Sequence, residues 1–104
     1  MFRIGNDIVL ISRIEKSIEN QRFVHEVFTP NECEYCRTPQ NYAGVFAAKE
    51  ALLKAFGTGI DRRLNTIEVL HDDQGKPYFN GIKNCDVSIS HDGEYAFAAV
   101  ILWE

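Results

Sequence analysis

The sequence predicts an α+β protein, a single domain over residues 1–104 in which an antiparallel β-meander packs against one long buried helix and shorter helices. Three observations predict this class: an apolar helical block near residues 41–56, strand-like segments after residue 66, and turn signals between those segments. A chain of 104 residues has the length of one ordinary domain. Its 45% apolar and 25% charged residues are typical of a folded globular protein.

A strand and a helix are predicted to open the chain. Residues 2–11 are β-branched and apolar enough for a strand, although Gly5, Asn6 and Asp7 interrupt it. Glycine inside a strand often marks a bulge or a close approach of two backbones. Ser12 and Glu15 match a capping box, and isoleucines then recur at helical spacing, which predicts a helix over about residues 12–25.

Two further helices are predicted. Residues 29–32, Thr-Pro-Asn-Glu, form a second capping box with proline at the first helical position, so a short helix should run to about Arg37. A longer helix should follow from about Asn41 to Phe56. Gly57 to Gly59 should end it, because glycine adopts the left-handed conformation that terminates helices.

The rest of the chain is predicted to be short strands joined by tight turns. Strands are expected over residues 66–70, 78–79, 86–90 and 95–102, with turns at 72–75 and 80–81. The last strand is apolar on both faces, so both faces should be covered. A helix can cover one face, and a neighbouring subunit could cover the other.

Composition excludes several classes of protein. No apolar run approaches the roughly 20 residues that span a bilayer, and the N-terminus lacks signal-peptide features, so we expect a cytoplasmic protein without a membrane partner. Cys33, Cys36 and Cys85 should be free thiols. The net charge of -4 disfavours nonspecific binding to nucleic acid.

Two charged residues stand out in the long apolar helix. Glu50 and Lys54 are four residues apart and fall side by side, flanked by small alanines. The ordinary interpretation is an ion pair along the helix, worth roughly 0.2–0.5 kcal/mol. The small neighbours leave space for a ligand, and a desolvated charge is costly unless a metal, phosphate or opposite charge meets it.

Two other segments hold candidate site residues. Asp7 lies among apolar strand residues and is either a turn or cap residue or a metal ligand. Magnesium is typically held by one or two protein carboxylates, which Asp7 and Glu50 could supply. His91 follows Ser88 and Ser90 at the end of a strand and is either an exposed turn residue or part of a site. A serine triad is poorly supported, because neither serine lies in a Gly-x-Ser-x-Gly elbow.

These segments appear in the order seen in one enzyme family. They are residues 5–9 (Gly-Asn-Asp-Ile-Val), 13–14 (Arg-Ile), 46–51 (Phe-Ala-Ala-Lys-Glu-Ala), 54–55 (Lys-Ala), 57–59 (Gly-Thr-Gly), 75–77 (Gly-Lys-Pro) and 88–91 (Ser-Ile-Ser-His). The chain resembles the holo-acyl-carrier-protein synthases, the short phosphopantetheinyl transferases. The resemblance covers almost the whole chain, and the block from Phe46 to Gly59 is its most specific part.

The resemblance implies an activity. Such an enzyme transfers 4′-phosphopantetheine from coenzyme A to a serine of apo acyl carrier protein, giving holo acyl carrier protein and 3′,5′-ADP in support of fatty acid biosynthesis. Asp7 and Glu50 would bind Mg²⁺ against the pyrophosphate, and Lys54 would contact the phosphate at the bond being broken. The serine proton would go to a carboxylate, with Glu50 acting directly or through a water. The nucleotide would be cradled by Lys49, Gly57, Gly59, Pro77 and His91.

The resemblance also implies partners. Acyl carrier proteins are acidic, so a basic face made of Arg13, Lys16 and Arg22 is a candidate docking surface, although it could also be an ordinary solvated helix face. A homotrimer with its active site between subunits is implied as well, and it would cover the second face of the last strand.

The sequence departs from the family pattern at two positions. Val45 stands where many relatives carry arginine, so one phosphate contact is missing, and Arg62 or Arg63 could substitute for it. Leu64 stands where relatives often have tryptophan. These departures bear on nucleotide binding and leave the metal and lysine positions intact.

Two other functions compete with the enzymatic one. A zinc or redox module could use Cys33 and Cys36 with Cys85 or a histidine, but a structural zinc site requires four ligands. A binding protein could keep the fold without activity. The intact carboxylates and lysine of the candidate site speak against this second alternative.

Overall fold

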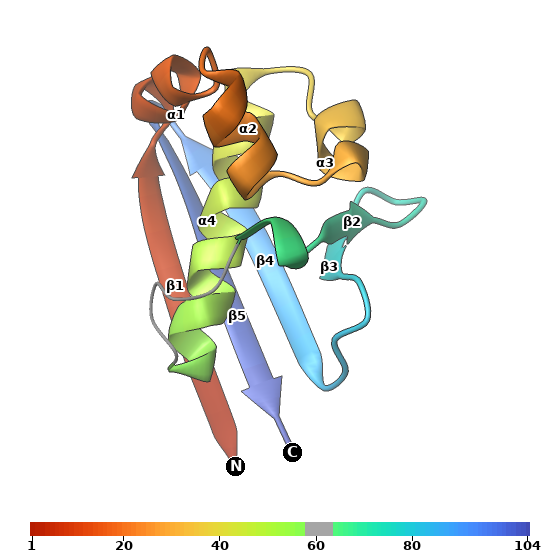
Figure 1. The fold of residues 1–104 in the computed structure, drawn as a ribbon. Coiled ribbons are helices and arrows are strands. Elements are labelled where there is room, and N and C mark those ends of the chain that lie inside the picture. Colours follow the sequence, from red (N-terminus) through yellow and green to blue (C-terminus); the bar gives the residue numbers. More distant parts are fainter. Residues whose placement is uncertain (58–63) are drawn as a thin grey trace.

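The structure, a computed structural model, describes residues 1–57 and 64–104. Its elements are β1 (Phe2–Leu10), α1 (Ile11–Ser17), α2 (Gln21–Val27), α3 (Pro30–Tyr35), α4 (Pro39–Phe56), the 3₁₀ turn η2 (Leu64–Thr66), β2 (Val69–His71), β3 (Pro77–Phe79), β4 (Cys85–Asp92) and β5 (Tyr95–Trp103). An antiparallel sheet has the order β1-β5-β4, and α4 lies across one face of it (Figure 1). The predicted α+β class is confirmed. Among the described residues the strands divide into two sheets, one of which is formed by β2 and β3.

The core lies between α4 and the three-stranded sheet. Small residues line both surfaces, and they are completely or almost completely buried: Ala47, Ala48, Ala51 and Ala55 on α4, and Ala96 and Ala98 on β5. Short side chains let the helix backbone come close to the sheet. This close packing fixes where the polar residues of α4 emerge beside β1 and β4.

Gly5 is required by this close packing. A Cβ atom at Gly5 would collide with the carbonyl oxygen of Ala51 and lie 2.6 Å from the amide nitrogen of Ala55. Both are backbone atoms of α4 and cannot rotate away. Of the two alternatives that the sequence left open at this glycine, a bulge or a close approach of two backbones, the structure shows the close approach.

Gly5→Ala is therefore expected to lower the free energy of unfolding by about 3 kcal/mol, the upper part of the range for overpacked cores. Urea unfolding at fixed protein concentration measures this loss. Asn6→Ala is the matched control, because Asn6 is the exposed neighbour on β1 and its change should stay within about 0.5 kcal/mol. An unchanged unfolding midpoint for Gly5→Ala would show that α4 can move away from β1.

The predicted helix over residues 12–25 is two helices. α1 begins at Ile11, with Leu10 as an N-cap that makes no side-chain hydrogen bond, so the predicted Ser12 capping box is wrong. Asn20 interrupts the segment and caps α2, its Oδ1 accepting from the amide of Arg22 at 2.9 Å. The helical spacing of the isoleucines predicted one continuous helix and gave no sign of a cap at Asn20.

The other helix signals agree better with the structure. The predicted capping box of α3 is confirmed, with Thr29 Oγ1 accepting from the Glu32 amide and Glu32 accepting from the Thr29 amide. α4 begins at Pro39, two residues before the predicted start, and ends at Gly57 in the left-handed conformation with φ 77°. The strand predicted from residue 66 begins only at Val69, because residues 64–66 form η2.

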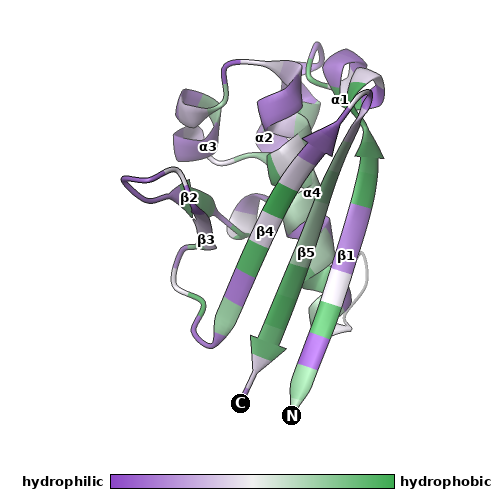
Figure 2. Ribbon diagram, turned by 180° about the vertical axis from the view of Figure 1, so that it is seen from behind, coloured by the Kyte–Doolittle hydropathy of each residue, from purple (hydrophilic) through white to green (hydrophobic). Residues whose placement is uncertain are grey.

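The sheet face away from α4 is open in the single chain. Figure 2 shows this face, with hydrophobic residues running along β5 and at both ends of β1. Large apolar side chains are exposed there, among them Ile8 at 63% and Phe97 at 38%. β5 is thus apolar on both faces, and α4 covers one of them. Within the described residues, no helix is long and apolar enough to cross a membrane.

Candidate active site

Asp7 and Lys54 meet beside the edge strand β1. Asp7 lies on the sheet face that α4 covers, and Lys54 lies in the last turn of α4. The Lys54 Nζ atom is 3.0 Å from Asp7 Oδ1 and donates a hydrogen bond to it. The lysine side chain is 58% exposed and the aspartate 16%. The cation therefore bridges two elements and remains open to a ligand from solvent.

Glu50 lies one turn before Lys54 and joins the same group. Burial raises the pKa of Glu50, and the neighbouring charge of Asp7 raises it further, while Lys54 and Arg13 act in the opposite direction. Two carboxylates and two cations thus interact at this point. We call Asp7, Glu50 and Lys54 the acidic cluster.

The acidic cluster has the donors that a magnesium ion prefers. Two half-buried carboxylates that repel each other would both gain from a divalent cation, and Mg²⁺ usually takes one or two protein carboxylates, with water and phosphate oxygens completing its shell. Among the described residues, no group of three or more histidine, cysteine or acidic side chains could hold a metal. The two carboxylates therefore do not form a closed structural metal site, and an ion held there would need further ligands from water or a bound molecule.

A second group of predicted residues lies beside β4. Pro77 and His91 line a hollow of about 160 Å³ together with Gly44 and Val45 of α4. The Nε2 atom of His91 donates to the carbonyl oxygen of Gln40 at 3.1 Å. A Cβ atom at Gly44 would lie 3.0 Å from Nε2 of His91, so glycine lets the imidazole rest against the helix.

The acidic cluster and this hollow lie on opposite flanks of α4. In the sheet order β1-β5-β4 the helix runs between the outer strands (Figure 1). Asp7 on β1 contacts Lys54 on one flank, and His91 on β4 lies beside Gly44 on the other. One chain therefore presents two separate half-sites, which we call the β1 flank and the β4 flank.

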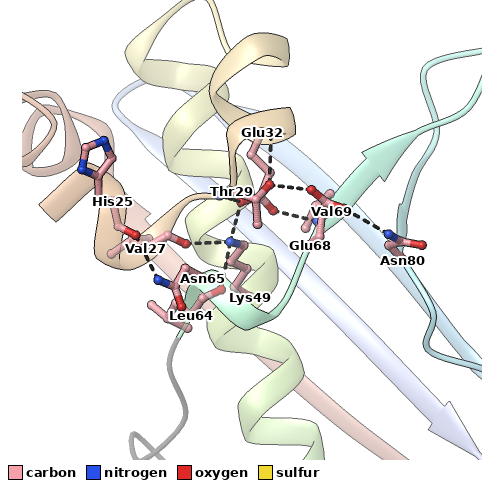
Figure 3. A network of polar contacts seen from close by, with 10 residues as sticks. All are labelled: His25, Val27, Thr29, Glu32, Lys49, Leu64, Asn65, Glu68, Val69 and Asn80. Atoms are coloured by element: carbon pink, nitrogen blue, oxygen red, sulfur yellow. Dashed lines mark hydrogen bonds and ion pairs between the residues drawn. The ribbon is translucent and has the colours of Figure 1, made fainter. Parts of the chain in front are cut away.

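Lys49 belongs to neither half-site, which corrects the expected nucleotide contact. Its side chain is completely buried and pairs with Glu32, which is equally buried. Its Nζ atom also donates to the carbonyl oxygens of Val27 at 2.6 Å and Leu64 at 3.0 Å (Figure 3). The three donors of the ammonium are used, so Lys49 joins parts of the fold and has none left for a phosphate.

The Lys49 pair continues into a longer polar network. Glu32 accepts from the amides of Thr29 and Val69, which ties α3 to β2. The Thr29 hydroxyl donates to Glu68 at 2.6 Å, and Asn80 also donates to Glu68 (Figure 3). The network joins α4, α3 and the two-stranded sheet.

The remaining predicted nucleotide contacts lie at or beyond the end of α4. Gly57 is exposed at the C-terminus of the helix. Gly59, Arg62 and Arg63 lie outside the described residues. Val45, the position at which many relatives are expected to carry arginine, lies inside α4 and lines the hollow of the β4 flank with an apolar side chain.

The predicted basic face is divided between two helices. Arg13 and Lys16 are exposed on α1, and Arg22 is exposed on α2, where it pairs with Glu26 at 3.4 Å. Arg13 also lowers the pKa of Glu50 through its charge, so it lies near the acidic cluster. A basic surface thus adjoins the β1 flank.

The cysteines give no support to a zinc or redox module. All three are free thiols, and Cys36 is buried. Burial, with the charges of Glu32 and Cys33, raises the pKa of Cys36 to about 12, so it is a poor source of the thiolate that binds metals.

Sequence reasoning missed several residues of the β4 flank. Asn41, Tyr35 and His71 line its hollow with Gly44. A glycine inside a long buried helix is costly, and that cost was a signal that another group approaches Gly44 closely. Tyr35 and His71 carried no such signal, because the folding of α3 beside β2 brings them together.

Comparison with known proteins identifies the class of protein to which this fold and site belong. A family model described as the 4′-phosphopantetheinyl transferase superfamily matches residues 3–100. The chain belongs to this superfamily. Curated relatives named holo-[acyl-carrier-protein] synthase include proteins of Nautilia profundicola, 45% identical, and Ruminiclostridium cellulolyticum, 41% identical. Each match covers 95% of this chain, and 97% and 90% of the respective relatives.

Solved structures agree with these relatives. The holo-(acyl-carrier-protein) synthase of Bacillus anthracis, in complex with CoA (3′,5′-ADP), is 39% identical with a TM-score of 0.84, covering 96% of this chain and 94% of that one. The Helicobacter pylori enzyme in complex with coenzyme A is 33% identical with a TM-score of 0.83, covering 93% and 96%. The arrangement of helix and sheet is therefore that of coenzyme A-binding proteins.

Proposed function

We propose that this chain is a holo-acyl-carrier-protein synthase, which transfers 4′-phosphopantetheine from coenzyme A to a serine of apo acyl carrier protein in support of fatty acid biosynthesis. The observation that carries the proposal is the acidic cluster, in which two carboxylates and an exposed lysine meet. The fold that holds this cluster is similar to that of solved synthases in complex with coenzyme A. The serine oxygen forms a bond to phosphorus as the bond to the leaving 3′,5′-ADP breaks.

Each residue of the acidic cluster has a role in this reaction. Asp7 and Glu50 would hold Mg²⁺, which supplies positive charge to the pyrophosphate when it is bound. Lys54 neutralises charge that builds on the leaving phosphate. Glu50 takes the proton of the serine hydroxyl, and burial raises its pKa in the direction that favours a general base.

We further propose that the complete site forms between copies of the chain in a homotrimer. The two half-sites lie on opposite flanks of α4, so one extended substrate would meet both if the β1 flank of one copy faced the β4 flank of the next. The open apolar face of the sheet supports the assembly, because exposed apolar patches of this kind mark protein interfaces.

Mixing two inactive variants tests the shared site. Lys54→Met damages the β1 flank, and His91→Ala damages the β4 flank. Assemblies co-expressed from both variants should recover up to about one quarter of wild-type activity, because that share of interfaces would combine two intact flanks. Asp7→Asn mixed with Lys54→Met is the control, since both changes damage the same flank. Equal activity in the two mixtures would place the whole site in one chain.

We assign docking of the acidic carrier to Arg13, Lys16 and Arg22. Lys16→Glu should raise KM for the carrier several-fold, weaken its dependence on salt, and leave KM for coenzyme A unchanged. Steady-state kinetics at two ionic strengths measure these effects. Lys83→Glu, an equal charge reversal at an exposed site, is the control. Equal effects of both variants would indicate a response to net charge alone.

The activity itself is tested by mass spectrometry of the carrier. Apo acyl carrier protein is incubated with the chain, coenzyme A and magnesium, and a second carrier enzyme of known activity serves as the positive control. The expected result is a carrier heavier by one phosphopantetheine group. An unmodified carrier beside a modified control would refute the function.

The cytoplasmic location stays a prediction, which cell fractionation tests.

A further inference from the structure

We propose that Tyr35 and His71 form a platform for the adenine base of coenzyme A on the β4 flank. The proposal rests on the function proposed above and adds two specificity residues to it. Tyr35 ends α3 and His71 ends β2, so two elements far apart in sequence supply the pair. Their ring centroids are 3.7 Å apart, and the ring planes differ by 6°. This is a parallel aromatic stack.

The stack borders two hollows of the β4 flank. Tyr35 and His71 line both the hollow of about 160 Å³ that contains His91 and an adjoining hollow of about 610 Å³. Gly75 also lines both, so the two hollows are neighbours. The larger one has a size usual for small-molecule sites, roughly 300–1,000 Å³. A nucleotide could therefore extend from His91 past the aromatic pair.

Charge determines which part of the nucleotide suits each hollow. The larger hollow is lined by three carboxylates, Glu34, Asp72 and Asp73, against one guanidinium, Arg37. Such a surface repels phosphate and can accept hydrogen bonds from the amino group of a base. None of the described residues lining the smaller hollow is acidic, and His91 is among them. The phosphate-bearing ribose fits the smaller hollow, and the base fits the larger.

His71 is suited to stacking and not to binding an anion. Burial lowers the pKa of His71, so its ring is neutral near pH 7 and offers no charge to a phosphate. Its Nδ1 atom is buried without a hydrogen-bond partner among the described residues. Bases stack on aromatic side chains because every base has a flat π face.

Two ligands that differ only in the base test the platform. Calorimetry compares 3′,5′-ADP with ribose 3′,5′-bisphosphate, which has the phosphates and lacks adenine. The wild type should bind 3′,5′-ADP at least about tenfold more tightly, a difference typical of base stacking. Tyr35→Ala and His71→Ala should lose most of this preference. Tyr35→Phe and His71→Phe, which keep a flat ring, should retain it.

The outcomes separate this inference from the proposed function. Alanine variants that keep the full preference for 3′,5′-ADP would overturn the platform, and so would variants that weaken both ligands equally. If Tyr35→Ala does not fold, the comparison of His71→Ala with His71→Phe decides. A wild type that transfers phosphopantetheine while showing no preference for the base would overturn the platform alone. A wild type that transfers nothing to the carrier would overturn the function.

Discussion

Replacing Glu50 with glutamine is expected to slow phosphopantetheine transfer by about 10²- to 10³-fold while leaving the fold intact. The amide keeps the shape of the side chain and removes its charge. It can neither accept the serine proton nor pair with Asp7 in holding a divalent cation, and losses of one such group are typically of this size. Mass spectrometry of the carrier over time measures the rate.

The same substitution should stabilise the fold at neutral pH. The pKa of Glu50 is raised above its ordinary value of 4.5, mainly by burial and next by Asp7. An acid with a raised folded-state pKa costs stability when it ionises, and the cost appears as pH rises from the unfolded value through the folded one. The advantage of Glu50→Gln over wild type should therefore grow over that interval and level off above it.

Urea unfolding at several pH values, at one protein concentration, checks this second effect. Glu15→Gln is the matched control, because Glu15 is an exposed carboxylate on α1 and should affect neither rate nor stability. Wild-type turnover in Glu50→Gln would remove Glu50 from the site. A slow but destabilised variant would mean that Glu50 supports the fold and would leave its chemical role to Asp7.

Two of the short-range signals predicted the fold, whereas the capping box at Ser12 did not. The capping box at Thr29 and the left-handed Gly57 act within one turn, and both are found in the structure. The division into α1 and α2 was missed, because the isoleucine spacing that ends at Ile18 predicted one helix extending past Asn20, whose side chain in fact caps a new helix. A side-chain cap of this kind competes with continuation of the helix, and sequence alone does not show which prevails.

The candidate site was predictable in its chemistry and less so in its arrangement. The charges of Glu50 and Lys54 were singled out as neighbours on one helix, yet Lys54 pairs with Asp7, 47 residues away. That contact depends on how α4 crosses β1, which follows from the small residues between them. The separation of Asp7 and His91 onto two flanks likewise follows from strand order, which no motif in the sequence encodes.

Lys49 shows how a family motif can conceal a structural residue. It directly precedes Glu50 in the most specific block of the sequence, so resemblance favoured a contact with the nucleotide. A helix turns by about 100° per residue, so adjacent residues face different surroundings. Glu50 faces the β1 flank, whereas Lys49 enters the buried network beneath α3 (Figure 3).

Lys49→Met is expected to be the most destabilising single change in this network, lowering the free energy of unfolding by about 3–5 kcal/mol. Removing the ammonium leaves the buried Glu32 carboxylate without its counterion and two backbone carbonyls without a donor. Burial already raises the pKa of Glu32 and lowers that of Lys49, so each charge depends on the other. Urea unfolding at fixed protein concentration measures the loss.

Two matched variants show whether the loss comes from the broken pair. Lys54→Met makes the same substitution on the same helix at an exposed pair, and it should cost about 1 kcal/mol or less while abolishing transfer. Lys49→Met combined with Glu32→Gln removes both buried charges, so it should cost clearly less than the sum of the two single changes. Additive losses would mean that the two charges stabilise the fold independently. A stable but inactive Lys49→Met would return Lys49 to the nucleotide site, against its buried position.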